Sequence, residues 1–97
     1  MNSAEVWYLY VVACNDGTLY TGICKDVARR LSEHNAGRGA RYTASRRPVL
    51  LRAVWRFPDF PSAIKAEVAL KRRTRAAKLQ VVEGGADYRG GVRESTG

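Results

Sequence analysis

The longest apolar run in the chain covers residues 6–14, which are rich in aromatic and β-branched residues and include no charged side chain. A run of this length and composition predicts a β-strand that is buried on both faces. A turn signal follows in Asn15-Asp16-Gly17, and residues 18–23 predict the returning strand of a hairpin. A third strand is predicted over residues 49–57, directly after Pro48.

The first predicted helix comes directly after the hairpin. Asp26 is a suitable N-cap for a helix that runs to about Asn35, and Gly37 is placed to end that helix in the left-handed conformation. Residues 37–47 mix glycine, arginine, threonine and serine, which predicts a basic loop with one short helical turn.

A second helix begins near Pro61, which is acceptable in a first turn, and extends to about residue 73, with a shorter helix after it. Gly84 and Gly85 are expected to end the regular structure. The domain is therefore predicted over residues 1–83, with a flexible tail over residues 84–97. The order β-β-α-β-α-α predicts an α/β (α+β) fold with a small three-stranded antiparallel or mixed sheet flanked by helices.

The charge of the chain is strongly positive and unevenly placed. Ninety-seven residues form one domain with a single small core, and the net charge is +8. Residues 25–56 contain nine basic and two acidic side chains, and residues 60–82 contain six basic and one acidic. This distribution predicts a polyanionic partner, most simply nucleic acid, and the alternative is a solvated basic surface.

Several classes of protein are not expected. The apolar run at residues 6–14 is too short to span a bilayer, and the N-terminal residues lack the basic start of a signal peptide. Cys14 and Cys24, with the single histidine, cannot complete a four-ligand zinc site. Reduced thiols without a disulfide, in a cytoplasmic protein with no membrane partner, are the expectation.

The register of the hairpin decides where Tyr10 and Tyr20 point. A two-residue loop of Asp16 and Gly17 would put the two phenols on opposite faces of the sheet. A three-residue loop that begins at Asn15, with Gly17 left-handed, would put them on one face. The sequence permits both registers, but only one position of the three-residue loop needs a positive φ, and a glycine fills it. We predict the shared face, although strand composition alone favours reading both tyrosines as ordinary strand aromatics.

The first helix carries two polar residues beside its apolar stripe. At 100° per residue, Val27, Leu31 and His34 share a narrow sector, and Arg30 lies at the edge of that sector. An arginine held at the edge of a core usually binds an anion. A histidine taken alone is more often packed and hydrogen-bonded than a ligand.

The second helix has one acid, Glu67, in the middle of its predicted apolar face. A carboxylate in that position must be paired, protonated or bound to a cation. Lys71 lies one turn further on and could pair with it, or Glu67 could be a metal ligand at the bottom of a basic site. The sequence leaves both interpretations open. The predicted apolar face consists of Phe60, Ala63, Ile64 and Leu70.

Together these residues resemble the GIY-YIG nuclease domain, and more narrowly the small stand-alone bacterial proteins of that family. Tyr8-Leu9-Tyr10 stands where the family has Gly-Ile-Tyr, and Tyr20-Thr21-Gly22 stands where it has Tyr-Ile-Gly. The family arginine falls on Arg30, its Tyr or His one turn later on His34, and its glutamate on Glu67. The resemblance covers residues 6–82, and five matches in order make it specific. Tyr8 and Thr21 depart from the family triplets.

The resemblance implies a metal-dependent endonuclease that hydrolyses phosphodiester bonds, with DNA expected before RNA. By resemblance, Glu67 holds one Mg²⁺ or Mn²⁺, Arg30 binds the scissile phosphate, and Tyr10 or Tyr20 activates or orients the water with help from His34. The alternative is a non-catalytic accessory module that binds nucleic acid, but the complete polar set favours the enzyme. Contacts to nucleic acid are expected from Lys25, Arg38, Arg41, Arg46, Arg47 and Lys71.

Overall fold

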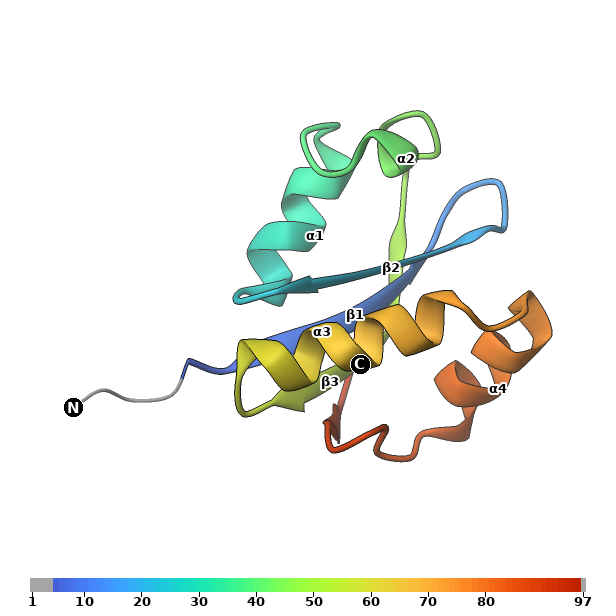
Figure 1. Cartoon of the computed structure of the whole chain (residues 1–97). Helices are drawn as coiled ribbons and strands as arrows, with labels where there is room; N and C mark the ends of the chain where they lie inside the picture. The colour runs from blue at the N-terminus through green and yellow to red at the C-terminus, as the bar shows by residue number, and fades with distance from the viewer. Residues whose placement is uncertain (1–4, 97) are drawn as a thin grey trace.

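The computed structural model describes residues 5–96 and contains one four-stranded antiparallel sheet, with strand order β2-β1-β3-β4. The sheet lies between two pairs of helices, α1 with α2 and α3 with α4 (Figure 1). The strands are β1 Trp7–Ala13, β2 Leu19–Cys24, β3 Leu50–Phe57 and β4 Val92–Glu94. The helices are α1 Val27–Asn35, α2 Arg41–Ala44, α3 Phe60–Lys71 and α4 Arg75–Gly84.

The β1–β2 hairpin adopts the predicted three-residue turn. Gly17 has a φ of 86° in the turn. Val12 then pairs with Tyr20, and Tyr10 pairs with Gly22. Because side chains alternate along a strand, both phenols lie on the same face, and their ring centroids are 6.5 Å apart. The prediction of a shared face is confirmed.

Side-chain caps start the three longer helices. The Asp26 carboxylate accepts a hydrogen bond from a first-turn N–H of α1. The Asp59 carboxylate caps α3 in the same way, and the Thr74 hydroxyl caps α4. Gly37, with a φ of 82°, follows α1 as predicted. The short helical turn expected within residues 37–47 is α2.

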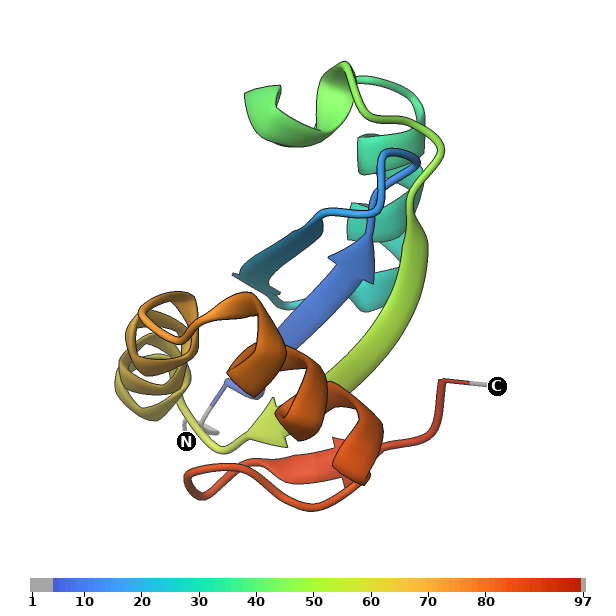
Figure 2. The same ribbon diagram turned by 90° about the vertical axis from the view of Figure 1, so that its right-hand side faces the viewer.

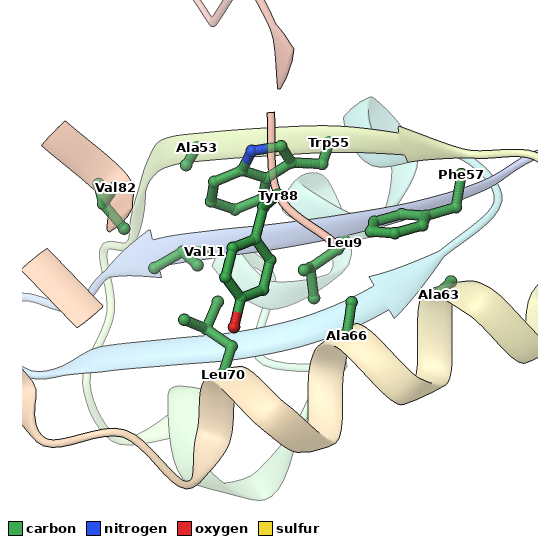
Figure 3. Packing of buried hydrophobic residues seen from close by; sticks show 10 residues of the cluster. All are labelled: Leu9, Val11, Ala53, Trp55, Phe57, Ala63, Ala66, Leu70, Val82 and Tyr88. Carbon is green, nitrogen blue, oxygen red and sulfur yellow. The ribbon is translucent and has the colours of Figure 1, made fainter. Parts of the chain in front are cut away.

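The central strand β1 contributes to two cores, one on each face of the sheet. Leu9 and Val11 pack against α3, and Tyr10 and Val12 face α1. The prediction that this strand is buried on both faces is therefore confirmed. Figure 3 shows the core on the α3 side, which consists of Leu9, Val11, Ala53, Trp55, Phe57, Ala63, Ala66, Leu70, Val82 and Tyr88.

The residues after α4 belong to the sheet and the core, so the expectation that regular structure ends at Gly84 and Gly85 is wrong. Strand β4 pairs with β3 and makes the sheet four-stranded instead of three-stranded (Figure 2). Tyr88 is buried against Trp55, with ring centroids 5.8 Å apart. The Trp55 indole N–H donates to the Ala86 carbonyl at 2.9 Å. The segment predicted to be a flexible tail therefore closes one side of the core.

Two further features of the described residues are the state of the cysteines and the length of the helices. Cys14 and Cys24 are buried and free, and burial raises the pKa of the Cys24 thiol to about 11. Within residues 5–96, every helix is too short or too polar to cross a bilayer.

Candidate active site

Four rings converge on the α1 side of the sheet, each from a different element. Tyr10 comes from β1, Tyr20 from β2, His34 from α1 and Tyr42 from α2. The His34 ring centroid lies 5.8 Å from that of Tyr10 and 5.3 Å from that of Tyr20. The Tyr42 ring stacks on Tyr20 at 5.9 Å. The structure thus brings three predicted site residues together and adds Tyr42, which the sequence analysis did not single out.

His34 is fully buried and hydrogen-bonded at both ring nitrogens. Its Nε2 lies 2.7 Å from the Tyr10 hydroxyl, and its Nδ1 lies 2.7 Å from the Thr43 hydroxyl. The Thr43 hydroxyl donates to the Ala40 carbonyl at 3.0 Å. His34 is therefore a packed histidine, as expected for the residue taken alone, and it can act on a bound molecule only through Tyr10.

Two glycines leave the space that these rings need. A Cβ atom on Gly22 would lie 2.6 Å from the Tyr10 hydroxyl oxygen. A Cβ atom on Gly39 would lie 2.3 Å from Nδ1 of His34. Both distances are shorter than a Cβ atom tolerates, so the backbone passes these side chains closely only because the residues are glycines. The glycine of the Tyr20-Thr21-Gly22 triplet thus has a packing role at the site.

Arg30 lies at the edge of this cluster, where the helical spacing predicted it. Its Nη1 donates to the Glu33 carboxylate at 3.0 Å, and its side chain is 32% exposed. The guanidinium is therefore oriented by Glu33 and still open to solvent. An anion outside the protein can reach it, which suits a phosphate-binding residue.

Burial sets the protonation of the Tyr10–His34 pair. It raises the pKa of Tyr10 to about 12, against the opposing effect of the Arg30 guanidinium. Burial also lowers the pKa of His34 below its ordinary value, and the positive charge of Arg30 lowers it further. At neutral pH the pair consequently rests as a neutral phenol beside a neutral imidazole.

Glu67 lies apart from the tyrosines, on a helix that covers the opposite face of the sheet. Its side chain is 14% exposed, and the Lys71 ammonium lies 3.2 Å from its carboxylate. The expectation that Glu67 occupies the middle of the apolar face is wrong, because Glu67 flanks that face. The residues of α3 that are fully buried are Ala63, Ala66 and Leu70.

The family resemblance implies one carboxylate, that of Glu67, as a metal ligand. Within residues 5–96, no three His, Cys, Asp or Glu side chains gather into a metal-binding group. A hard cation such as Mg²⁺ can nevertheless be held by one carboxylate together with water and phosphate oxygens. Glu67 fits that kind of site, although a cation would have to take the place that Lys71 now occupies.

The basic residues predicted to bind nucleic acid differ in whether their charged groups already contact other protein groups. Arg38 and Arg41 are exposed. Arg46 instead donates to the Asp16 carboxylate at 3.0 Å and lies over the Tyr42 ring at 3.9 Å. The remaining three are also engaged: Lys25 pairs with Glu5, Lys71 pairs with Glu67, and Arg47 donates to the Ala44 carbonyl. Contact with phosphates stays a prediction for all six.

Comparison with known proteins agrees with this geometry. The model of the GIY-YIG catalytic domain matches residues 6–80. A UPF0213 protein of Cupriavidus pinatubonensis is 47% identical over 79 residues, which cover 81% of this chain and 88% of that protein. A UPF0213 protein of Streptococcus sanguinis is 47% identical over 76 residues, which cover 78% and 87%.

Two solved structures are similar over most of their length. A protein from E. faecalis superimposes with a TM-score of 0.60 at 42% identity, covering 87% of this chain and 90% of its own. A UPF0213 protein from Bacillus halodurans gives a TM-score of 0.54 at 41% identity, covering 80% and 83%. The fold is that of a nuclease-type domain family. The chain belongs to the GIY-YIG family, among the small bacterial members that carry the name UPF0213.

Proposed function

We propose that this protein is a metal-dependent endonuclease that hydrolyses phosphodiester bonds in nucleic acid, with DNA as its substrate. The observation that carries the proposal is the ring cluster of Tyr10, Tyr20 and His34. Arg30 lies partly exposed at the edge of this cluster. A group that can bind phosphate thus lies beside groups that can orient water. The family match supports the same class of reaction.

Each residue has a role in this proposal. Arg30 binds the scissile phosphate, because its guanidinium is positioned by Glu33 and remains accessible. Its charge also offsets the negative charge that develops on the phosphate oxygens. Tyr10 and Tyr20 orient the attacking water. Tyr10 differs from Tyr20 in having a proton acceptor, the Nε2 atom of His34 at 2.7 Å.

Glu67 would hold a single Mg²⁺ or Mn²⁺, which neutralises charge on the leaving side of the phosphate when it is bound. What supports this role is a largely buried carboxylate whose one ionic partner is a half-exposed lysine. A lysine that is free to swing into solvent can be displaced by a cation.

Binding of the nucleic acid would depend on charge more than on sequence. The exposed residues Arg38 and Arg41 lie close in the chain to Tyr42, next to the ring cluster. Contacts of this kind go to phosphates and are the same for every sequence. We therefore expect weak, salt-sensitive binding with little sequence preference, in a cytoplasmic setting that suits the two free thiols.

The second candidate is a binding module that uses the same surface without cleavage. One observation favours it: Glu67 lies on the opposite side of the sheet from Tyr10 and His34 and is already paired with Lys71. In that case the fold and the positive charge would be kept while the metal site had no function.

A cleavage panel separates the two candidates. Linear, nicked, flapped and branched DNA, and matched RNA, would be incubated with the protein in Mg²⁺, Mn²⁺ or EDTA. We expect metal-dependent cleavage of at least one DNA substrate, abolished in Arg30→Gln. Arg29→Gln is the matched control, because Arg29 lies on the same helix and its side chain is 79% exposed. Binding to all substrates without cleavage in either metal would favour the module.

A further inference from the structure

A second group of basic side chains lies on the α3 side of the sheet, away from the ring cluster. It comes from two segments, the residues where α3 ends and α4 begins and the turn that precedes β4. We call it the junction surface, and it consists of Arg72, Arg73, Arg75 and Arg89. We propose that the junction surface binds phosphates of a nucleic-acid strand and is a second contact region for the substrate. This inference rests on the proposed function and deepens it.

Tyr88 brings the two segments together. The guanidinium carbon of Arg73 lies 5.7 Å from the Tyr88 ring centroid, and that of Arg89 lies 5.9 Å from the same centroid. The ring itself is held in the core against Trp55, and Figure 3 shows it reaching Leu70 in the last turn of α3. Two exposed cations from distant parts of the chain therefore share one buried ring. Arg89 lies beyond the residues that match the family domain.

The junction surface lacks the acidic partners that neutralise other cations of this protein. All four arginines are exposed. The ion pairs formed within residues 5–96 include none of them. The acids of α3, α4 and the following turn are engaged elsewhere, Glu67 by Lys71, Glu83 by Arg52 and Asp87 by the Arg93 backbone N–H. Four cations without acidic partners repel one another, and a bound polyanion would relieve that repulsion.

Two of the four arginines stand where an arginine weakens the fold. Arg89 has a φ of 47°, in a turn closed by hydrogen bonds of 3.0 Å and 2.8 Å between Tyr88 and Gly91. Glycine, asparagine and aspartate are the usual residues in such a turn, because other side chains are strained in the left-handed region. Arg75 is the first residue of α4, where the helix dipole disfavours a cation. Stability of the fold therefore gives no reason for an arginine at either position.

The chemistry of the junction surface fits the backbone of a nucleic acid. A guanidinium group binds phosphate through two parallel hydrogen bonds, and all four residues carry one. A nucleic-acid strand has one phosphate about every 3.4 Å of helix axis, so a strand that crosses this surface meets several arginines. A membrane-binding surface would also present large apolar side chains beside the charges. Residues 71–76 contain no apolar side chain larger than that of alanine.

The position of the junction surface relates it to the candidate active site. Lys71, the partner of Glu67, is the residue directly before Arg72. Figure 1 shows the connection between α3 and α4 at the end of the sheet where the β1–β2 turn lies, and Tyr20 follows that turn. A strand bound on the junction surface would therefore continue toward Glu67 and Tyr20. A substrate that also reaches Arg30 would be contacted on both faces of the sheet.

Binding measured in EDTA tests the junction surface without cleavage. The whole protein would be titrated into a fluorescein-labelled DNA duplex of about 20 base pairs, between about 50 and 200 mM salt. In the variant with Arg72→Gln, Arg73→Gln, Arg75→Gln and Arg89→Asn, we expect affinity to fall at least about tenfold. The slope of log K against log salt should fall by about 3 units, since each lost phosphate contact removes about 0.9.

Single replacements supply a matched pair of variants. Arg75→Gln should lower the salt slope by about 1 unit. Lys65→Gln removes the same charge from an exposed position on α3 and should leave the slope unchanged. Equal effects of the two replacements would mean that only the net charge of the protein matters, and would overturn the junction surface.

Arg89→Asn gives a second readout of opposite sign. Asparagine tolerates a positive φ, so the urea midpoint of unfolding should stay the same or rise, while the salt slope for DNA falls by about 1 unit. A lower urea midpoint with unchanged DNA binding would show that Arg89 serves the fold alone, which contradicts its part in the proposal.

Failure of the junction surface is distinguishable from failure of the proposed function. Unchanged affinity and salt slope in the fourfold variant would overturn the surface, and so would wild-type protein that binds phosphatidylserine vesicles but no DNA. A wild type that loses DNA binding in the fourfold variant, yet cleaves no substrate in either metal, contradicts the hydrolase alone. A wild type that cleaves DNA, with the same rate and affinity in the fourfold variant, contradicts the junction surface alone.

Discussion

Replacing Glu67 by glutamine separates its two interpretations, since the amide keeps the shape of the side chain and removes its charge. The Glu67–Lys71 pair spans one helical turn at 3.2 Å, with Lys71 49% exposed. A pair of this kind contributes about 0.3–0.5 kcal/mol. Glutamine can still accept a hydrogen bond from Lys71, and the burial of a charge is relieved. The free energy of unfolding should therefore change by less than about 0.5 kcal/mol in the absence of metal, or rise slightly.

The effect on cleavage should be far larger if Glu67 binds the metal. Losing the one carboxylate of the site should slow single-turnover cleavage in Mg²⁺ at least about 100-fold, which corresponds to about 2.7 kcal/mol of transition-state stabilisation. Binding of DNA in EDTA should stay the same or tighten, because a negative charge has been removed. Urea denaturation, filter binding and cleavage in a Mn²⁺ titration measure the three quantities separately.

Glu83→Gln is the matched control for Glu67→Gln. Glu83 also lies in a helix on that side of the sheet, but its side chain is 64% exposed and is 3.9 Å from Arg52. Its replacement should change neither stability nor cleavage. A Glu67→Gln protein that cuts DNA in Mg²⁺ as fast as the parent would refute the metal-site assignment. Lower stability with unchanged cleavage would mean that Glu67 serves only to pair with Lys71.

Three further changes test other parts of the structure. Replacing Arg38, Arg41 and Arg47 together by glutamine should weaken binding to all DNA sequences equally and reduce the salt-dependence slope by roughly 2–3 units in a fluorescence titration, whereas a sequence-selective loss would indicate base readout. Tyr88→Ala should lower the urea-derived free energy of unfolding by about 3 kcal/mol, and no loss would mean that the C-terminal segment does not stabilise the core. Burial lowers the folded-state pKa of His34 below its ordinary value, so the contribution of this group to stability is present above pH 6.5 and should be lost as the pH falls below that value. His34→Gln should flatten urea stability over that window, and an unchanged profile would contradict the buried neutral imidazole.

The sequence could predict the hairpin site because the determinants are local. Strand alternation and one glycine at a positive φ place Tyr10 and Tyr20, and both features belong to neighbouring residues. The cap at Asp26 and the helical period then place Arg30 and His34 one turn apart on α1. No long-range contact had to be known for these assignments.

Thr43 could not be found in the same way. Its contact with His34 depends on where the four-residue helix α2 packs against α1, and the local sequence does not fix that position. Apart from Tyr42, the residues around it are small or basic and show no periodic pattern. The three-residue strand β4 was missed for a related reason, because alternation cannot be recognised over so few positions directly after two glycines.

The face of α3 was misjudged because alanine carries little weight in a hydrophobic pattern. Phe60 and Ile64 moved the predicted apolar face toward Glu67, whereas Ala63 and Ala66 are the residues that are fully buried. Small side chains let the helix approach the sheet closely, so burial on α3 follows size as well as hydrophobicity. The same shift explains why Glu67 flanks the core instead of occupying its centre.

The strand order bears on where a nucleic acid would have to bind for the proposed endonuclease mechanism. Arg30 belongs to the α1 side of the sheet and Glu67 to the α3 side, and β2 is the edge strand between them (Figure 1). Since the two residues lie on opposite faces, we expect one phosphate to reach both of them by way of the edge of β2. Tyr20 is the site residue on that strand, and its ring is only partly buried. A substrate that crosses this edge would meet Tyr20 first, with Tyr10 and His34 behind it. The edge of β2 is therefore where we expect the Arg30 side and the Glu67 side of the proposed mechanism to meet.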